Sequence, residues 1–256
     1  MAKPILQKSL HDWMETRNVL KKNGASIGFV PTMGALHAGH GSLLEHCRRE
    51  NDISVLSIYV NPTQFNNPED LKKYPITLER DCEIAEKAGV DHILLPTYDQ
   101  MYPDEYRYKV TERELSNRLC GTHRPGHFDG VLTVVMKLLN LVQADRAYFG
   151  EKDFQQLQLV RGMTDAFFLK TQIVPCQIIR EADGLAMSSR NVNLSPAGRE
   201  KAPLIYRTLC EAESPEAARS VLEKAGFTVD YIEDIGSRRF AAATIDNVRL
   251  IDNVEK

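Results

Sequence analysis

Two histidines at the start of an expected helix are the first residues of this sequence that could do chemistry. In the segment GFVPTMGALHAGH (28–40), an apolar run reaches a proline and a turn, and His37 and His40 follow three residues apart. Residues at this spacing lie on one side of a helix, and the free N–H groups of a helix start attract anions. The spacing therefore predicts that both imidazoles face one anion, and a polyphosphate is the natural candidate.

Other interpretations of these histidines remain open from spacing alone. They could cap the helix and satisfy loop carbonyls. A structural metal site is a third option, although no cysteine or third well-spaced ligand accompanies the pair. The chain contains neither GxGxxG nor GxxxxGK followed by Ser or Thr, which are the familiar phosphate-binding loops. If the protein binds a nucleotide, it uses a different motif.

Cationic side chains occur in two further segments. GEKD (150–153) follows an expected strand and opens a helix, where the ammonium of Lys152 beside a glycine suits contact with phosphate. Asp153 with Gln156 also fits a helix N-cap and its answering residue, so capping alone could explain both. MSSR (187–190) lies in a polar loop, where serines and an arginine are common, yet it would supply hydroxyl donors and a permanent cation.

Alternating strands and helices are expected to position these segments. Pro31 should end the first strand, because it lacks a backbone donor. This order is typical of an α/β protein with a Rossmann-like, doubly wound parallel sheet, whose ligand crevice lies at the carboxyl ends of the strands. The strand-like runs are 25–30, 52–60, 91–96, 146–150 and 172–179, and the expected helices are 39–50, 78–89, 130–142 and 153–168.

The character of the sequence changes near residue 176. Residues 182–200 are small, polar and rich in turn formers, as in a mobile loop between domains. Helical patterns at 196–211 and 214–225 then lead to two strand-like runs, the second of which ends in 248–254. We therefore predict a Rossmann-like domain over residues 1–175 and a smaller α+β C-terminal domain over residues 176–256.

The composition argues against several classes of protein. Lys and Arg number 32 against 35 Asp and Glu, and this net charge of -3 gives no general reason to bind nucleic acid or an acidic membrane. The 5 cysteines include no CxxC pair, which argues against a disulfide framework and fits a reducing cytoplasm. No apolar stretch approaches the ~18 residues of a membrane span. We expect a cytoplasmic protein without nucleic-acid or membrane partners.

Six motifs in order give the chain a resemblance to a known family. The HxGH spelling after a strand resembles the signature of the nucleotidylyltransferase superfamily, which is related to class I aminoacyl-tRNA synthetases. The whole set is similar in order and spacing to the pantothenate synthetases, also called pantoate-beta-alanine ligases, along nearly the entire chain. The motifs are PTMGALHAGH (31–40), YVNPTQFNNPEDLKKYP (59–75), RPGHFDGV (124–131), YFGEKDFQQL (148–157), DGLAMSSRN (183–191) and RLIDN (249–253).

The resemblance implies ATP-dependent ligation of (R)-pantoate and beta-alanine to pantothenate. Pantoate would attack the α-phosphate of ATP to give pantoyl adenylate and pyrophosphate, and the amine of beta-alanine would then attack the acyl carbon and release AMP. The first domain would bind ATP and pantoate, and the second would act as a lid. Mg²⁺ on the phosphates and a homodimer are also implied, and we assign no protein ligand to the metal.

The resemblance also implies roles for individual residues. His40, His37, Lys152 and Arg190 would be catalytic, with His40 also a proton donor, while Gln64 and Gln156 would bind substrate and hold pantoate. The RPGH segment is left open between a carboxylate-binding Arg124 and a structural turn. The residues expected at ATP are Met33, Gly34, Ala35, Leu36, His37, Ala38, Gly39, His40, Gly150, Glu151, Lys152, Asp153, Ile179, Met187, Ser188, Ser189 and Arg190.

Two other functions remain as alternatives. Another HxGH nucleotidylyltransferase would join a nucleoside triphosphate to a phosphorylated acceptor, and it would need a second strongly cationic pocket where NPTQF and DFQQ offer glutamines. A catalytically inactive relative could bind metabolites instead. Loss of a phosphate-contacting residue would favour that interpretation, and none is missing from the motifs.

Overall fold

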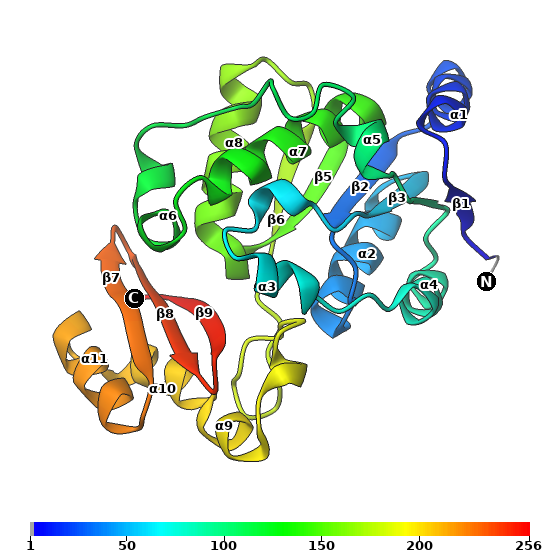
Figure 1. Cartoon of the computed structure of the whole chain (residues 1–256). Coiled ribbons are helices and arrows are strands. Elements are labelled where there is room, and N and C mark those ends of the chain that lie inside the picture. The colour runs from blue at the N-terminus through cyan, green and yellow to red at the C-terminus, as the bar shows by residue number, and fades with distance from the viewer. Residues whose placement is uncertain (1–2) are drawn as a thin grey trace.

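A parallel sheet forms the centre of the computed structural model, which describes residues 3–256 (Figure 1). Its strands lie in the order β1-β4-β3-β2-β5-β6, and every neighbouring pair is parallel. The predicted Rossmann-like α/β fold is confirmed. The strands are β1 (Ile5–Gln7), β2 (Ile27–Thr32), β3 (Ile53–Ile58), β4 (His92–Leu94), β5 (Arg146–Gly150) and β6 (Gln172–Cys176).

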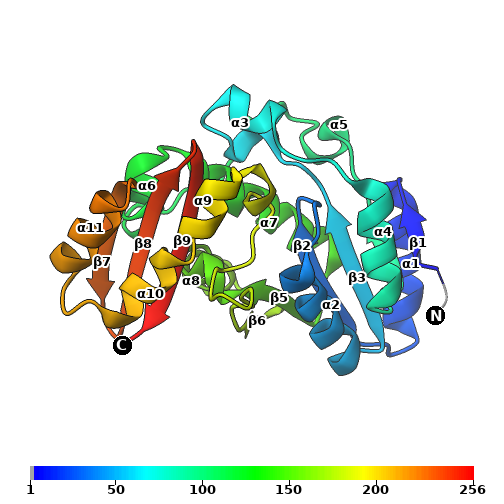
Figure 2. The same cartoon turned by 90° about the horizontal axis from the view of Figure 1, so that it is seen from below.

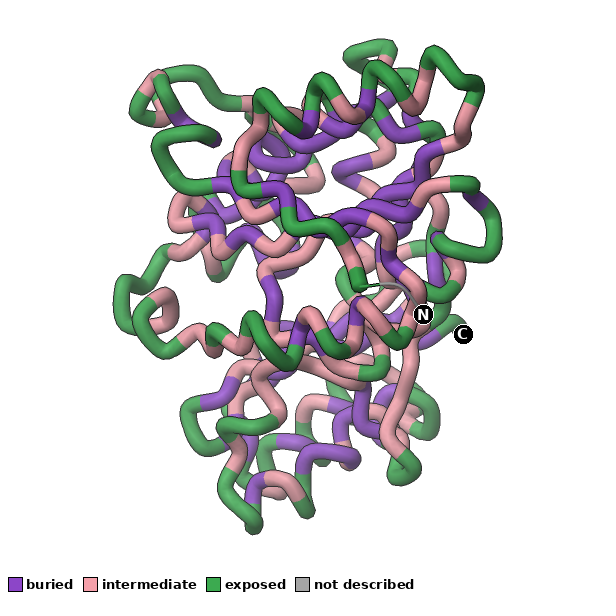
Figure 3. Tube along the Cα trace, turned by 90° about the vertical axis from the view of Figure 1, so that its right-hand side faces the viewer, coloured by how far each residue is buried: buried purple, intermediate pink, exposed green. Residues whose placement is uncertain are grey.

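Helices cover both faces of this sheet. One face packs against α1 (Leu10–Lys22), α7 (His127–Val142) and α8 (Phe154–Ala166), and the other against α2 (Ala38–Glu50) and α4 (Leu78–Lys87). Successive strand residues serve opposite faces: Phe29 packs with Trp13 of α1, whereas Val30 packs with Leu44 of α2. The result is three layers. In Figure 3 the buried segments run through the interior of the trace, and the exposed ones lie mostly at its outer turns.

The order of the strands determines where a ligand can bind. From β2 the chain builds the sheet outward through β3 and β4, and it then returns to place β5 on the other side of β2. The loops that follow β2 and β5 therefore diverge, which opens a crevice at their carboxyl ends. PTMGALHAGH follows β2 and GEKD follows β5, so the topology places both motifs at this crevice.

One expectation about the first part of the chain is wrong, and two of its elements were not predicted. Strand β2 continues through Pro31 to Thr32, whose carbonyl accepts a hydrogen bond from the backbone N–H of Tyr59 in the loop after β3. Since strand residues alternate their bonding sides, the donor that Pro31 lacks would face β5, whose pairing with β2 ends at Phe29 and Ala147. The N-terminal elements β1 and α1 were not expected, although α1 buries Trp13 and Arg17.

Several loops of the first part of the chain, and the loop after β6, contain short helices. The loop after β3 contains η1 and α3, and η3 precedes α8 directly. Their bounds are η1 (Pro62–Gln64), α3 (Pro68–Lys72), α5 (Tyr98–Met101), η2 (Leu115–Asn117), α6 (Cys120–His123), η3 (Glu151–Asp153) and η4 (Asn191–Asn193).

The last part of the chain is a three-stranded antiparallel sheet with helices on one face. It has one strand more than the two that the sequence suggested. The other face of the sheet turns toward the first part of the molecule, where Tyr231, Phe240 and Ala242 join the largest apolar cluster (Figure 2). The division at residue 175 stays a prediction. The elements are α9 (Pro196–Lys201), α10 (Leu204–Glu211), α11 (Pro215–Lys224), β7 (Thr228–Ile235), β8 (Arg238–Ile245) and β9 (Val248–Glu255).

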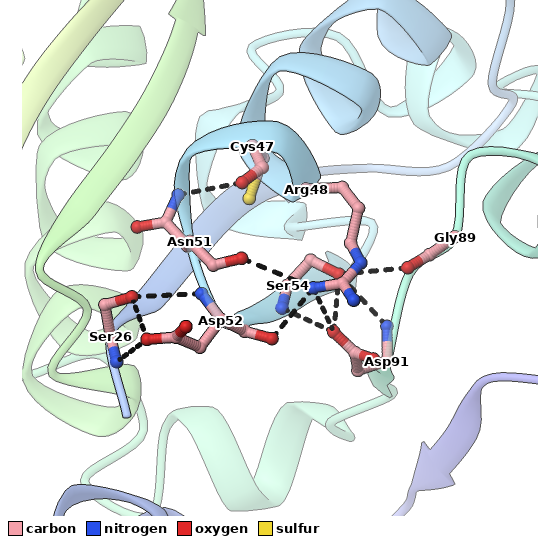
Figure 4. Close-up of polar contacts among 8 residues, drawn as sticks. All are labelled: Ser26, Cys47, Arg48, Asn51, Asp52, Ser54, Gly89 and Asp91. Carbon is pink, nitrogen blue, oxygen red and sulfur yellow. Dashed lines mark hydrogen bonds and ion pairs between the residues drawn. The ribbon is translucent and has the colours of Figure 1, made fainter. Parts of the chain in front are cut away.

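A polar network closes the amino-terminal edge of the parallel sheet (Figure 4). The carboxylate of Asp52 accepts from the backbone N–H and the hydroxyl of Ser26, and that of Asp91 accepts from both groups of Ser54. Arg48 donates to the carbonyls of Asn51 and Asp52. These bonds tie β2, β3 and β4 together at the edge opposite the crevice.

Gly130 of α7 packs closely against the backbone of η1, which lies at the crevice. A Cβ at this position would overlap the carbonyl oxygen of Thr63 and lie 2.7 Å from Cα of Gln64. We expect Gly130→Ala to lower the free energy of unfolding by about 1–3 kcal/mol, because overpacking must displace η1. Urea unfolding measures this change.

The matched control is Gly162→Ala on α8, where an added Cβ meets nothing within 4 Å. That change should stabilise the protein by up to about 1 kcal/mol, since alanine is the better helix former. Equal effects of the two substitutions would contradict the close packing of α7 on η1.

Candidate active site

A cavity of about 250 Å³ lies at the carboxyl ends of β2, β3 and β5. Its wall contains residues from five of the six sequence motifs, all but RLIDN, and residues 177–179 beyond β6. The structure thus brings together both predicted glutamines and all four predicted catalytic residues, which are His37, His40, Gln64, Lys152, Gln156 and Arg190.

The residues expected at ATP divide into two groups. Those that line the cavity are Met33, His37, Gly39, His40, Gly150, Lys152, Asp153, Ile179, Met187, Ser188, Ser189 and Arg190. Five others do not line it, namely Gly34, Ala35, Leu36, Ala38 and Glu151. The side chain of Leu36 instead packs in the apolar cluster beneath α2 and α4. The individual contacts to ATP stay predictions.

His37 and His40 cap the start of α2 reciprocally. Nδ1 of His37 accepts from the backbone N–H of Gly39 at 3.1 Å, and Nδ1 of His40 accepts from the backbone N–H of His37 at 3.3 Å. The capping interpretation therefore describes one nitrogen of each ring. In a neutral imidazole whose Nδ1 accepts, the proton is on Nε2. Each ring can then offer an Nε2–H donor to a ligand in the cavity.

Both imidazoles are neutral at neutral pH. Burial is the main cause that lowers the pKa of His37 to about 4, and the positive charge of Lys152 adds to it. Burial likewise lowers the pKa of His40 to about 3, with smaller contributions from His37 and Lys152. The permanent positive charge at the cavity consequently comes from Lys152, Arg190 and Arg124, of which Arg124 donates to the Gln64 carbonyl.

Asp81 of α4 holds the loop that precedes the histidines. Its carboxylate, only 1% exposed, accepts from the backbone N–H groups of Ala35 at 3.0 Å and Leu36 at 2.8 Å. Gly34 has φ +83°, and a Cβ there would lie 2.8 Å from the Asp81 carboxylate, so this position requires glycine. Sequence reasoning missed Asp81, because an acid in the charged helix LERDCEIAEK carries no distinguishing pattern.

Gln64 is fixed in the wall by bonds to both its side chain and its backbone. Asn61 donates to Oε1 at 3.0 Å, and Nε2 donates to the Met33 sulfur at 3.2 Å. His127 Nδ1 donates to the Gln64 carbonyl at 2.8 Å, and Arg124 donates to the same oxygen. In this structure the RPGH segment supports the NPTQF turn, a role that the sequence left open.

The apolar part of the wall lies beside Gln64. It comes from α7 and the end of β5, with Val131, Val134, Val135, Leu138 and Phe149. Such a surface suits the hydrocarbon portion of a small acid.

Lys152 and Arg190 approach the cavity from different loops. Lys152 lies 3.7 Å from the Asp153 carboxylate, and Arg190 lies 3.2 Å from the Asp70 carboxylate of α3. Both cations can therefore exchange a carboxylate partner for phosphate.

Asp153 makes no side-chain capping bond at the start of α8, so the capping explanation for Asp153 and Gln156 is wrong.

A second cavity of about 890 Å³ adjoins the first. The residues that the two share include Lys152, Gln156 and Arg190, and strands β7, β8 and β9 contribute to the wall of the second. Within residues 3–256, no group of three or more His, Cys, Asp or Glu side chains is placed to hold a metal ion. None of the helices in this described range has the length and apolar character needed to cross a membrane.

Comparison with known proteins identifies close relatives. The family model described as pantoate-beta-alanine ligase matches residues 6–255. The pantothenate synthetase of Bdellovibrio bacteriovorus is 56% identical over 235 residues, which cover 92% of this chain and 94% of the relative. That of Coxiella burnetii is 51% identical over 247 residues, with 96% and 95% coverage.

Solved structures agree with these sequence matches. The pantoate-beta-alanine ligase of Francisella tularensis, in a complex described as containing beta-gamma ATP and beta-alanine, has a TM-score of 0.94 at 41% identity, over 98% of this chain and 97% of that one. The pantothenate synthetase of Thermus thermophilus has a TM-score of 0.90 at 39% identity, with 98% and 99% coverage.

Replacement of Asp81 tests its support of the loop. Asp81→Asn leaves one acceptor oxygen and directs an amide donor at a backbone N–H, so we expect a loss of about 1–3 kcal/mol in the free energy of unfolding. Urea unfolding measures the loss. The control is Glu79→Gln, which removes an exposed negative charge from the same helical turn. If both variants were as stable as the parent, the Asp81 bonds would contribute nothing.

The buried histidines predict a dependence of stability on pH. Burial is the main cause that lowers the pKa values of His37, His40 and His127, to about 4, 3 and 3. In the unfolded chain these histidines have the ordinary pKa of about 6.5, so below pH 6.5 the unfolded chain binds more protons than the folded protein. The free energy of unfolding should be highest above pH 6.5 and fall on acidification. Urea unfolding between pH 7 and pH 5 measures this slope, which His127→Gln should reduce. A flat profile would contradict the neutral state of these rings.

Proposed function

The chain belongs to the pantoate-beta-alanine ligase family, and from this premise we propose that it joins (R)-pantoate to beta-alanine in two ATP-dependent steps through a pantoyl adenylate. It is an enzyme of the pantothenate synthetase type. The finer proposal concerns the intermediate, the released AMP and pyrophosphate, and the residues that act.

One observation carries this proposal. Cationic side chains, neutral imidazoles and the two predicted glutamines line a single cavity beside an apolar wall. Phosphate needs the cations and the N–H donors, whereas the hydroxyl groups of pantoate suit neutral amides that both donate and accept. The ATP and beta-alanine in the Francisella complex are consistent with this assignment.

The chemistry requires activation of a carboxylate. A free carboxylate is a poor acyl donor because its leaving group would be an oxide. In the first step, a pantoate carboxylate oxygen attacks the α-phosphorus of ATP and pyrophosphate leaves with the bonding electrons. In the second, the amine of beta-alanine attacks the acyl carbon, loses a proton, and AMP leaves. Neither step needs a protein nucleophile.

The side chains then orient the reactants and stabilise growing charge. Lys152 and Arg190 would contact phosphate oxygens as cations, with Ser188 and Ser189 as hydroxyl donors. His37 and His40 would donate Nε2–H bonds, because their Nδ1 atoms are engaged at the start of α2. Preorganised donors of this kind are each worth about 100- to 1000-fold in rate. Gln64 and Gln156 would hold pantoate in line with the α-phosphate.

Magnesium would enter with ATP as the counterion of its phosphates. The described part of the chain offers no group of three or more acidic, histidine or cysteine ligands, so phosphate oxygens and water would supply the coordination. We assign no step of the reaction to the metal.

Three further proposals concern the whole protein. Family membership supports a homodimer, and the five free cysteines are consistent with a reducing cytoplasm. The three-stranded sheet with α9, α10 and α11 would form the C-terminal lid domain, which begins near residue 176, because it contributes one wall of the larger cavity.

Omission of single components tests the reaction. We expect AMP release only with ATP, pantoate and beta-alanine together, and pyrophosphate release from ATP and pantoate alone. A coupled assay measures AMP, and a pyrophosphate assay measures the first step. AMP formation without beta-alanine, or no pyrophosphate from ATP and pantoate, would contradict the adenylate route.

The same assays test the role of His40. His40→Ala removes an Nε2–H donor and one capping bond, and we expect pyrophosphate release to fall by at least about 100-fold. His11→Ala changes an exposed histidine of α1 and should leave the rate unchanged. Circular dichroism establishes that both variants are folded, and an unimpaired His40 variant would refute the assignment.

A further inference from the structure

The RLIDN motif near the end of the chain has no part in the function proposed above. Its residues belong to β9, whose side chains alternate between two faces. Val248, Leu250 and Val254 pack in the apolar cluster beneath α10 and α11. Arg249, Ile251 and Asn253 point the other way, toward the first part of the molecule. Asn253 is the member of this set that reaches the loop of Lys152.

Asn253 binds the backbone of η3 with its side-chain amide. Nδ2 donates to the carbonyl of Glu151 at 2.9 Å and to the carbonyl of Lys152 at 3.0 Å, and Asn253 as a whole is only 2% exposed. An amide has two N–H donors, and both are used here. A carboxylate of the same shape could make neither bond.

Arg238 fixes the orientation of this amide. Its guanidinium donates to Oδ1 of Asn253 at 2.6 Å and lies over the ring of Phe154, 4.2 Å from the centroid. Phe154 is the first residue of α8, directly after η3. With the oxygen bound to Arg238, the NH₂ group must face the two carbonyls.

These contacts connect the three-stranded sheet to the segment that carries Lys152. The segment 150–153 joins β5 to α8, and Asp153 makes no side-chain capping bond there. Asn253 comes from a distant part of the chain, and its amide binds the carbonyls of the two peptide groups that flank the Lys152 Cα. The Lys152 side chain leaves this fixed backbone and enters the cavity.

We propose that Asn253 is a positioning residue for Lys152: by binding the carbonyls of Glu151 and Lys152, it places the ammonium where the phosphates of ATP react. The inference rests on the proposed function, in which Lys152 contacts phosphate. It also means that the ATP site is complete only when β9 is docked against η3, so the C-terminal sheet contributes to catalysis through the position of Lys152.

Asn253→Asp is the sharpest test, because it keeps the shape of the side chain and removes both donors. We expect kcat/KM for ATP to fall by about 10- to 100-fold, as for other small displacements of a reacting group. KM for pantoate should stay within about twofold. Asn140→Asp is the control: it makes the same change in an exposed asparagine that donates to a carbonyl within α7.

A double-mutant cycle separates positioning from a general loss of structure. If Asn253 acts through Lys152, the Asn253→Asp change should lower kcat/KM for ATP by less than about threefold in a Lys152→Ala background. Equal effects in both backgrounds, or an unimpaired Asn253→Asp enzyme, would overturn the inference. Should Asn253→Asp fail to fold by circular dichroism, Asn253→Ser, which retains one donor, replaces it in the cycle.

The two proposals can fail separately. If the parent releases AMP as expected and Asn253→Asp matches it, only the role of Asn253 is refuted. If the parent makes no AMP, the function is refuted, and titration with ATP alone tests the site. Weaker ATP binding in Asn253→Asp than in Asn140→Asp then supports the positioning of Lys152, whereas equal affinities or no ATP binding refute it.

Discussion

The reciprocal capping of α2 by His37 and His40 is the interaction on which the site depends. It satisfies two backbone N–H groups at the helix start, and in doing so it occupies Nδ1 of both rings. Burial keeps the imidazoles neutral, so their remaining protons lie on Nε2. A structural role and a chemical role are thereby divided between the two nitrogens of each ring. The same contacts that start the helix leave an Nε2–H donor on each of two rings at the cavity.

The rest of the molecule holds the two loops that diverge at β2 and β5. Asp81 fixes the first loop through the N–H groups of Ala35 and Leu36, and Asn253 fixes the second through the carbonyls of Glu151 and Lys152. Asp81 and Asn253 are both buried, and each binds backbone groups of its loop. Neither side chain lines the first cavity. The polar network at the opposite end of the strands joins β2 to β3 and β4.

Motifs that follow strands were predictable, and supports from elsewhere in the chain were not. The positions of His40 and Lys152 after β2 and β5 follow from apolar runs interrupted by turn residues. Asp81 lies in a segment that looks like an ordinary charged helix. Asn253 lies in the RLIDN motif, but the motif gave no role for it, so only the contacts of the two residues reveal what they support. Pro31 was expected to end β2, yet its missing donor costs nothing because β5 has already stopped pairing there. Local rules fail where the neighbouring strand decides the outcome.

The sequence by itself determined the alternation of strands and helices from β2 to β6, the family, and a set of candidate residues for phosphate and a small acid, because periodicity and motif spelling are local properties of the chain. Only the tertiary structure decided that these residues share one cavity, that both imidazoles are neutral, and that Arg124 and His127 support the turn of Gln64. The physical reason is that burial and hydrogen-bond partners are set by segments far away in the sequence. Charge, tautomer and side-chain direction follow from those partners, and no spacing along the chain encodes them.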